Sequence, residues 1–171
     1  CFFHHCAYST TDSHASDGGV RAAWCELFDR YQVDLVLQGH NHVYERTDPI
    51  RGDRPTKVAG DNSTVDAETD GTVYYTVGCA GRPRYGFQPG EPESYRGHEA
   101  PDTFVPNSYV WTADGKKKAE AVGWSRVRFR NYAFIRVDVR PGQLLSEMDV
   151  TAVDEHGREF DKVTYRRRVR A

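Results

Sequence analysis

Two histidines, His40 and His42, stand two positions apart directly after an apolar segment and carry the clearest chemical signal in this sequence. The segment 33–37 is short, mostly apolar and rich in branched side chains, and Gly39 follows it. This is the pattern of an interior strand covered on both faces. Ligands and catalytic groups gather at the carboxyl ends of such strands. Two imidazoles in a loop at that edge can converge on one small volume, so the spacing predicts a metal site.

Other interpretations of His40-Asn41-His42 remain open at this point. The same three letters occur in ββα-metal nucleases. A histidine-triad nucleotide hydrolase needs a third alternating histidine, and Tyr44 occupies that position. A purely structural explanation is two loop histidines bonded to backbone carbonyls. The metal interpretation is favoured because further histidines are predicted at the same edge.

The elements that position these histidines form a predicted βαβ unit. Residues 1–4 are expected to be a strand ending at His4, and residues 20–31 repeat apolar side chains at helical spacing, with Trp24 and Phe28 as core. A strand, a helix and a second strand in this order imply a parallel pair with a right-handed crossover. His4 and the later histidine pair should therefore emerge at one edge of the sheet.

Two more histidines lie near this edge in the sequence. His5 follows His4, and in an extended chain adjacent side chains point in opposite directions, so only one of the two would face a given site. His14 lies in residues 7–19, which have no apolar periodicity and are predicted to be a loop. Without further context His14 would be a solvent-exposed surface residue.

Composition limits the class of protein. A chain of 171 residues with 23 basic and 25 acidic side chains is long enough for one domain with a core and is nearly neutral, so we expect no nucleic-acid partner and no membrane partner. No apolar run is long enough for a membrane span, and the start lacks the regions of a signal peptide. Since the first residues read as the second half of a strand, we expect the chain to be the carboxyl-terminal part of a longer protein.

The motifs together resemble a known family. Phe2-Phe3-His4-His5-Cys6-Ala7-Tyr8-Ser9, His14 ten residues after His4, and residues 39–46, Gly-His-Asn-His-Val-Tyr-Glu-Arg, are similar to the last third of the calcineurin-like metallophosphoesterases, and specifically the purple acid phosphatases. The resemblance covers roughly the whole chain, with motifs up to about residue 50 and layout beyond it. It implies an α/β fold, the carboxyl-terminal half of a four-layer α/β/β/α sandwich, with residues 1–171 forming part of one catalytic domain whose amino-terminal half is absent.

The resemblance also implies site residues. His4 and His40 would bind one metal of a dinuclear centre and His42 the other, typically ferric iron, so the cofactor is expected to be Fe with Zn, Mn or Fe. His14 matches the loop histidine that lies beside the scissile phosphate and is the candidate proton donor. The expected supporting residues, around the metals or the substrate, are His5, Asn41, Tyr44 and Gly78.

The implied activity is hydrolysis of phosphate monoesters, with a small phosphorylated substrate and a secreted or periplasmic location. The family's upstream ligands, two aspartates, a tyrosine and an asparagine, have no counterpart here, so the missing amino-terminal half of the same protein is an expected partner. Two alternatives remain: a catalytically incomplete module that binds metal or a partner, and a phosphodiester or nucleotide hydrolase with the same centre. A substrate panel would separate the latter from a monoesterase.

The rest of the chain is predicted mainly from turns and alternation. Residues 47–71 are polar and are predicted to be an excursion between strands. Residues 72–77 are predicted to be a strand, and the Gly78 that follows it would let the backbone approach the site. Residues 82–123 are predicted to be a lid or substrate-side loop, in which His98 and Trp111 could line a pocket. Residues 127–165 alternate and predict an antiparallel meander in the second sheet. The four cysteines allow three pairings, with Cys6 and Cys79 both at the presumed active edge.

Overall fold

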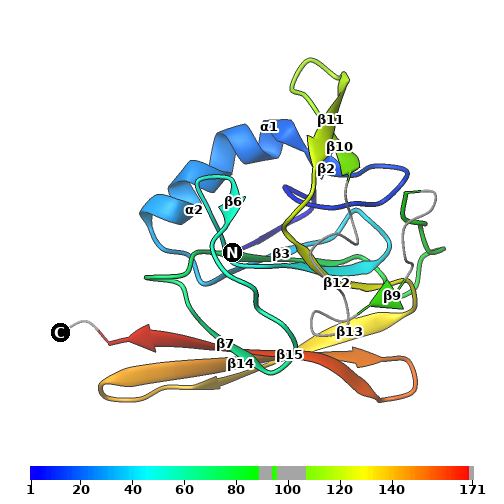
Figure 1. Ribbon diagram of the computed structural model, residues 1–171. Helices are drawn as coiled ribbons and strands as arrows, with labels where there is room; N and C mark the ends of the chain where they lie inside the picture. Colours follow the sequence, from blue (N-terminus) through cyan, green and yellow to red (C-terminus); the bar gives the residue numbers. More distant parts are fainter. Residues whose placement is uncertain (89–93, 96–106, 170–171) are drawn as a thin grey trace.

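Three stacked layers make up the part of the chain that the computed structural model describes, residues 1–88, 94–95 and 107–169. A helical segment covers one face of a six-stranded sheet, and a four-stranded sheet covers the other face (Figure 1). The predicted α/β class is confirmed, with three layers of the expected four present in these residues. Within them, no helix is long and apolar enough to cross a membrane.

The six-stranded sheet holds the predicted strand ends. Its first three strands are parallel to one another and the other three are antiparallel to their neighbours. In spatial order the strands are β1 (Phe2–Phe3), β3 (Leu35–Gln38), β8 (Val73–Val77), β4 (Tyr44–Thr47), β12 (Ser125–Phe129) and β9 (Ser94–Tyr95). The interior strands β8 and β4 are buried along most of their length, as expected for strands covered on both faces.

The predicted βαβ unit is present, because β1 and β3 pair in parallel with a helical segment between them. That segment consists of α1 (Gly18–Val20), a π-helical turn η1 (Arg21–Cys25) and α2 (Glu26–Arg30). It begins two residues earlier than predicted because Asp17 caps it: Asp17 Oδ1 accepts a hydrogen bond from Val20 N at 3.0 Å.

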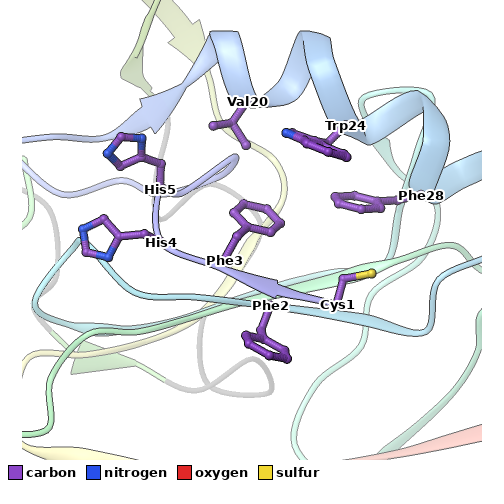
Figure 2. Close-up of a pocket in the computed structure, with 8 residues that line it drawn as sticks. All are labelled: Cys1, Phe2, Phe3, His4, His5, Val20, Trp24 and Phe28. Atoms are coloured by element: carbon purple, nitrogen blue, oxygen red, sulfur yellow. The ribbon is translucent and has the colours of Figure 1, made fainter.

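The prediction that Trp24 is core is wrong, whereas Phe28 is buried as expected. Trp24 is 51% exposed, and Phe2 on the edge strand β1 is 86% exposed. Figure 2 shows Phe3, Trp24 and Phe28 on the helix side of β1 and Phe2 on the opposite side, around a hollow of about 490 Å³. The apolar residues at the β1 edge are thus uncovered by the described part of the chain.

The four-stranded sheet contains the predicted meander. Its strands are β13 (Ala133–Arg140), β14 (Leu145–Asp154), β15 (Glu159–Arg168) and β7 (Ser63–Asp66). Two expectations are corrected here. The strand β12 belongs to the six-stranded sheet, although its alternation suggested the meander, and residues 47–71 are more than an excursion, because β7 pairs in parallel with β15.

Smaller elements complete the described chain. The strand β10 (Asn107–Trp111) forms a hairpin with β11 (Lys117–Ala121) and pairs with the short β2 (Ser16–Asp17), while β5 (Ile50–Arg51) and β6 (Arg54–Pro55) form a separate hairpin. Trp111 is half-buried on β10, with Lys117 Nζ 5.0 Å from its ring centre. His98 and residues 89–93 and 96–106 of the predicted lid lie outside the described residues.

All four cysteines are free thiols, so the possible bridge between Cys6 and Cys79 is absent. Cys1 is exposed, whereas Cys6 and Cys79 are buried. Burial raises the pKa of the Cys6 thiol to about 12 and that of Cys79 to about 11. Since the thiolate is the reactive species, both buried thiols should be unreactive at neutral pH.

We expect alkylation at pH 8 to modify Cys1 quickly and Cys6 and Cys79 at least about 100-fold more slowly, because a pKa of 11 or more leaves only about one thiolate in a thousand at that pH. Mass spectrometry of tryptic peptides after timed labelling measures this directly. Labelling in denaturant is the control and should modify all four thiols at similar rates. Rapid modification of Cys6 or Cys79 in the native protein, or a disulfide-linked peptide, would contradict the expectation.

Candidate metal centre

The parallel register of β1 and β3 brings the predicted histidines together. Phe3 is paired with Gln38, so the next residues on each strand, His4 and Gly39, leave the sheet at the same level. The backbone N–H of Gly39 donates to the carbonyl of His4 at 3.1 Å. His40 therefore begins its loop beside His4, as the sequence predicted.

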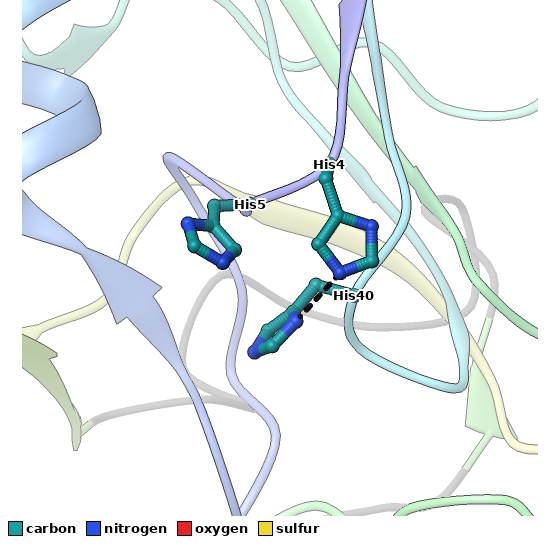
Figure 3. A group of neighbouring side chains, drawn as sticks. All are labelled: His4, His5 and His40. Atoms are coloured by element: carbon teal, nitrogen blue, oxygen red, sulfur yellow. Dashed lines mark hydrogen bonds between the residues drawn. The ribbon is translucent and has the colours of Figure 1, made fainter.

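Three imidazoles converge at this edge, those of His4, His5 and His40 (Figure 3). His40 Nδ1 lies 3.0 Å from His4 Nε2, and the ligand nitrogens of all three lie within 4.8 Å of one another. Two nitrogens bound to one tetrahedral metal at about 2.0–2.1 Å are about 3.3 Å apart. The His4–His40 spacing therefore fits two ligands of a single transition-metal ion.

His40 is held in a form suited to coordination. Burial first, and then the charges that the surrounding histidines would carry, lower the pKa of His40 to about 4. Its imidazole is consequently neutral at neutral pH, with a lone pair available to a metal. Neutral imidazole suits zinc, iron and similar ions, whereas magnesium and calcium prefer oxygen ligands. The donor set in this cluster thus fits the metals that the sequence predicted.

His5 is closer to the centre than expected. The prediction that adjacent His4 and His5 must face opposite ways is wrong, because β1 ends at Phe3 and residues 4–5 form a bend instead of extended chain. The rings of His5 and His40 are 4.8 Å apart between centres. His5 Nδ1 also lies 3.6 Å from Asp17 Oδ2, a carboxylate near the cluster that sequence reasoning missed.

His14 lies on the other side of His40, with 4.4 Å between ring centres. Its loop is fastened to the sheet by Glu45, a fully buried carboxylate on β4. Glu45 accepts hydrogen bonds from Ser9 Oγ at 3.0 Å and from Thr10 N at 2.8 Å. The sequence placed His14 near the site only through the family resemblance, and the anchored loop explains physically how it is held there.

His42 stands apart from the three-histidine group but close enough to affect the pKa of His40. His42 Nδ1 lies 2.8 Å from the carbonyl oxygen of Pro83, and its ring stacks on Tyr85 with 4.1 Å between centres. Because a carbonyl only accepts, this contact is a hydrogen bond only when Nδ1 carries the proton, and in the neutral ring that tautomer leaves the lone pair on Nε2. The assignment of His42 to a second metal stays a prediction.

The remaining predicted residues support the loop. Asn41 is fully buried and its Nδ2 donates to the carbonyl of Ala15 at 3.1 Å, which ties the histidine loop to the His14 loop. Asn41 Oδ1 has no hydrogen-bond partner among the described residues. Tyr44 differs from its predicted place around the metals or the substrate: it is buried, and its hydroxyl donates to Asp161 at 2.6 Å in the core between the two sheets.

Gly78 lets the strand-end backbones meet, as predicted. A Cβ at Gly78 would overlap the carbonyl oxygen of Asn41 and lie 3.2 Å from that of Gly39. We expect Gly78→Ala to destabilise the protein by about 1–3 kcal/mol, because the histidine loop must move away from β8. Gly81→Ala is the matched control, since nothing lies within 4 Å of a Cβ there. Urea denaturation of both variants checks this, and equal stabilities would show that the loop yields freely.

Comparisons with known proteins were made on sequence and on structure. No model of a known protein family matches the sequence. The uncharacterized protein Rv2577 of Mycobacterium tuberculosis is 35% identical over 161 residues, which cover 82% of this chain and 28% of that protein. Two Arabidopsis thaliana proteins match 43% of the chain: probable inactive purple acid phosphatase 24, 35% identical over 12% of its length, and purple acid phosphatase 21, 36% identical over 14%.

A solved structure agrees with the layered fold. Purple acid phosphatase PPD1 from yellow lupin (Lupinus luteus) seeds superposes with a TM-score of 0.65 and 18% identity, covering 96% of this chain and 24% of that one. The chain thus shares the layered α/β fold of the matching part of that structure. Its predicted resemblance to the purple acid phosphatases is confirmed by this neighbour and by the plant relatives. It spans less than a third of the length of these proteins.

Proposed function

We propose that this chain supplies the histidine ligands of a dinuclear metal centre that hydrolyses phosphate monoesters. The observation that supports this most directly is the 3.0 Å spacing of His4 Nε2 and His40 Nδ1 at a sheet edge where the rings of His5 and His14 also lie beside His40. The relative named purple acid phosphatase 21 is named for a phosphatase activity, which agrees with this proposal. The metals proposed are Fe with Zn, Mn or Fe.

In this proposal each histidine has a defined role. His4 and His40 bind one metal and His42 the other through Nε2, which the Pro83 carbonyl leaves unprotonated. The bound ions would neutralise phosphate oxygens and supply hydroxide at mildly acidic pH. His14, whose ring lies 4.4 Å from that of His40, would hold the phosphate and donate a proton to the departing alcohol oxygen.

The proposal also requires oxygen ligands. In the described residues, the one group that could hold a metal contains only histidines. We propose that the carboxylates come from another part of a longer protein, since the chain spans 28% of its mycobacterial relative. The uncovered β1 edge, with Phe2 and Trp24, is the surface against which that part would pack. A secreted or periplasmic location is proposed on the resemblance to plant purple acid phosphatases.

The test is made on the full-length protein. We expect elemental analysis to give about two metal ions per polypeptide and p-nitrophenyl phosphate to be hydrolysed near pH 5. A panel including bis(p-nitrophenyl) phosphate and nucleotides distinguishes a monoesterase from a diesterase or nucleotidase with the same centre. Absence of both metal and turnover would overturn the proposal and favour the alternative, a catalytically incomplete module. One Arabidopsis relative is itself named a probable inactive purple acid phosphatase.

A further inference from the structure

The segment around Tyr85 holds His42 at three points. His42 Nδ1 contacts the carbonyl oxygen of Pro83 at 2.8 Å, and the backbone N–H of Tyr85 donates to the carbonyl of His42 at 3.2 Å. The Tyr85 ring lies on the His42 ring, with centres 4.1 Å apart and planes 23° apart. The side chain, the main chain and the ring face of His42 are thus all engaged by one short segment.

This segment is itself fixed on its other side. The backbone N–H of Asp12 donates to the carbonyl of Gly86 at 3.0 Å, and Arg130 Nε donates to the carbonyl of Tyr85 at 3.0 Å. A Cβ at Gly86 would approach Asp12 Oδ2 to 2.6 Å, so the two loops run in close contact. Tyr85 is therefore held between the histidine loop and the loop that carries His14, whose ring centre is 5.3 Å from its own.

The consequence for His42 is chemical. A neutral imidazole carries its proton on one nitrogen, and the hydrogen bond of one ring nitrogen decides which one is left to bind a metal. In water the neutral ring favours the proton on Nε2. Holding Nδ1 against the Pro83 carbonyl reverses this and leaves the Nε2 lone pair free. The Pro83 contact needs a fixed ring plane, which the stacked Tyr85 provides.

We propose that Tyr85 is a positioning residue that holds His42 in its Nδ1-protonated tautomer, ready to bind a metal through Nε2. The metal-binding consequence rests on the proposed function, whereas the tautomer is a property of the metal-free protein. This division makes the two parts separately testable.

The tautomer is read by long-range 15N–1H correlation spectroscopy on metal-free protein labelled with 15N in histidine, at pH 8. We expect His42 to be protonated at Nδ1 in the wild type and in Tyr85→Phe, which keeps the ring. In Tyr85→Ala we expect a mixture of tautomers. Tyr31→Ala, which removes an exposed tyrosine ring, is the matched control and should leave the His42 signals unchanged. Unchanged signals of His4 and His156 in Tyr85→Ala verify that the fold persists, whereas those of His14 should shift because its ring contacts Tyr85.

The proposal is overturned if wild-type His42 carries its proton on Nε2, or if Tyr85→Ala leaves the tautomer unchanged. A second readout addresses the metal. After equilibrium dialysis of the full-length protein against Zn²⁺, Tyr85→Ala should bind one of two ions about 10- to 100-fold more weakly and the other normally. A changed tautomer with both ions retained would support the positioning role and exclude His42 as a ligand, a failure of the proposed function alone.

Discussion

Replacement of His40 is expected to reduce metal affinity at the His4–His40 position by at least about 100-fold, and phosphatase turnover of the full-length protein with it. Changing a residue that merely supports a metal ligand costs about 10- to 100-fold, so losing the ligand itself should cost at least as much. His40 is the most connected member of the cluster, with the rings of His4, His5 and His14 all within 5 Å of its own. Elemental analysis after dialysis and p-nitrophenyl phosphate turnover measure the two effects.

The choice of variant matters because His40 has φ of +45°. Asparagine tolerates this left-handed backbone better than alanine does. His40→Asn therefore separates loss of the ligand from loop strain, and His40→Ala is the comparison. His156→Ala is the matched control, since that imidazole is exposed in the turn between β14 and β15. Metal content and turnover equal to wild type in His40→Asn would contradict the ligand role.

The strand ends at the site could be predicted because the signal there is local. A short apolar strand followed by glycine and histidine shows which histidines lie at the carboxyl end of a strand. The parallel pairing of β1 with β3, which brings these strand ends together, then follows from chain order. Tyr85 could not be found in this way. It is one aromatic residue in a glycine-rich segment without periodicity, and only the contact with His42, 43 residues earlier in the sequence, gives it a role.

The helix shows where periodicity misleads. Positions 24 and 28 lie on one predicted stripe, and their rings do stack, with 6.4 Å between centres. Phe28 is buried, but Trp24 lies over the β1 edge that the described residues leave uncovered, and it is 51% exposed. The apolar pattern marks one face of the helix and does not show how much of that face is covered.

The strand β12 was assigned to the wrong sheet for a different reason. Its alternation of valine, phenylalanine and arginine suggests one wet face, but Arg126 and Arg128 are buried. Arg126 pairs with Asp48 through contacts of 2.7–3.1 Å, and Arg128 lies 3.8 Å from Glu45. Both acidic partners lie about 80 residues earlier in the sequence. Alternation cannot distinguish a buried, paired arginine from a solvated one.

The largest stability effect is expected at the ion pair that joins the two main sheets. Arg46 on β4 donates from Nε to Asp161 Oδ2 at 2.6 Å and from a terminal nitrogen to Oδ1 at 2.8 Å, and Tyr44 donates to the same carboxylate. Both charged side chains are at most 1% exposed. Burial alone would lower the pKa of Arg46, but Asp161 more than offsets this and holds it well above the usual value. The arginine stays charged, so it depends on its partner.

We expect Asp161→Asn to destabilise the protein by about 3–5 kcal/mol, because asparagine keeps the shape but leaves a buried guanidinium without its counter-charge. The double variant Arg46→Met, Asp161→Leu should recover most of that loss, since replacing both ions with apolar groups removes the uncompensated charge. Asp138→Asn is the control: Asp138 also bonds an arginine, Arg136 at 2.9 Å, but both side chains are half exposed, and no measurable change is expected. Urea denaturation compares the three. If the double variant were as unstable as Asp161→Asn, the pair would be stabilising through its geometry across the sheets, and not only by cancelling a charge that the fold has buried.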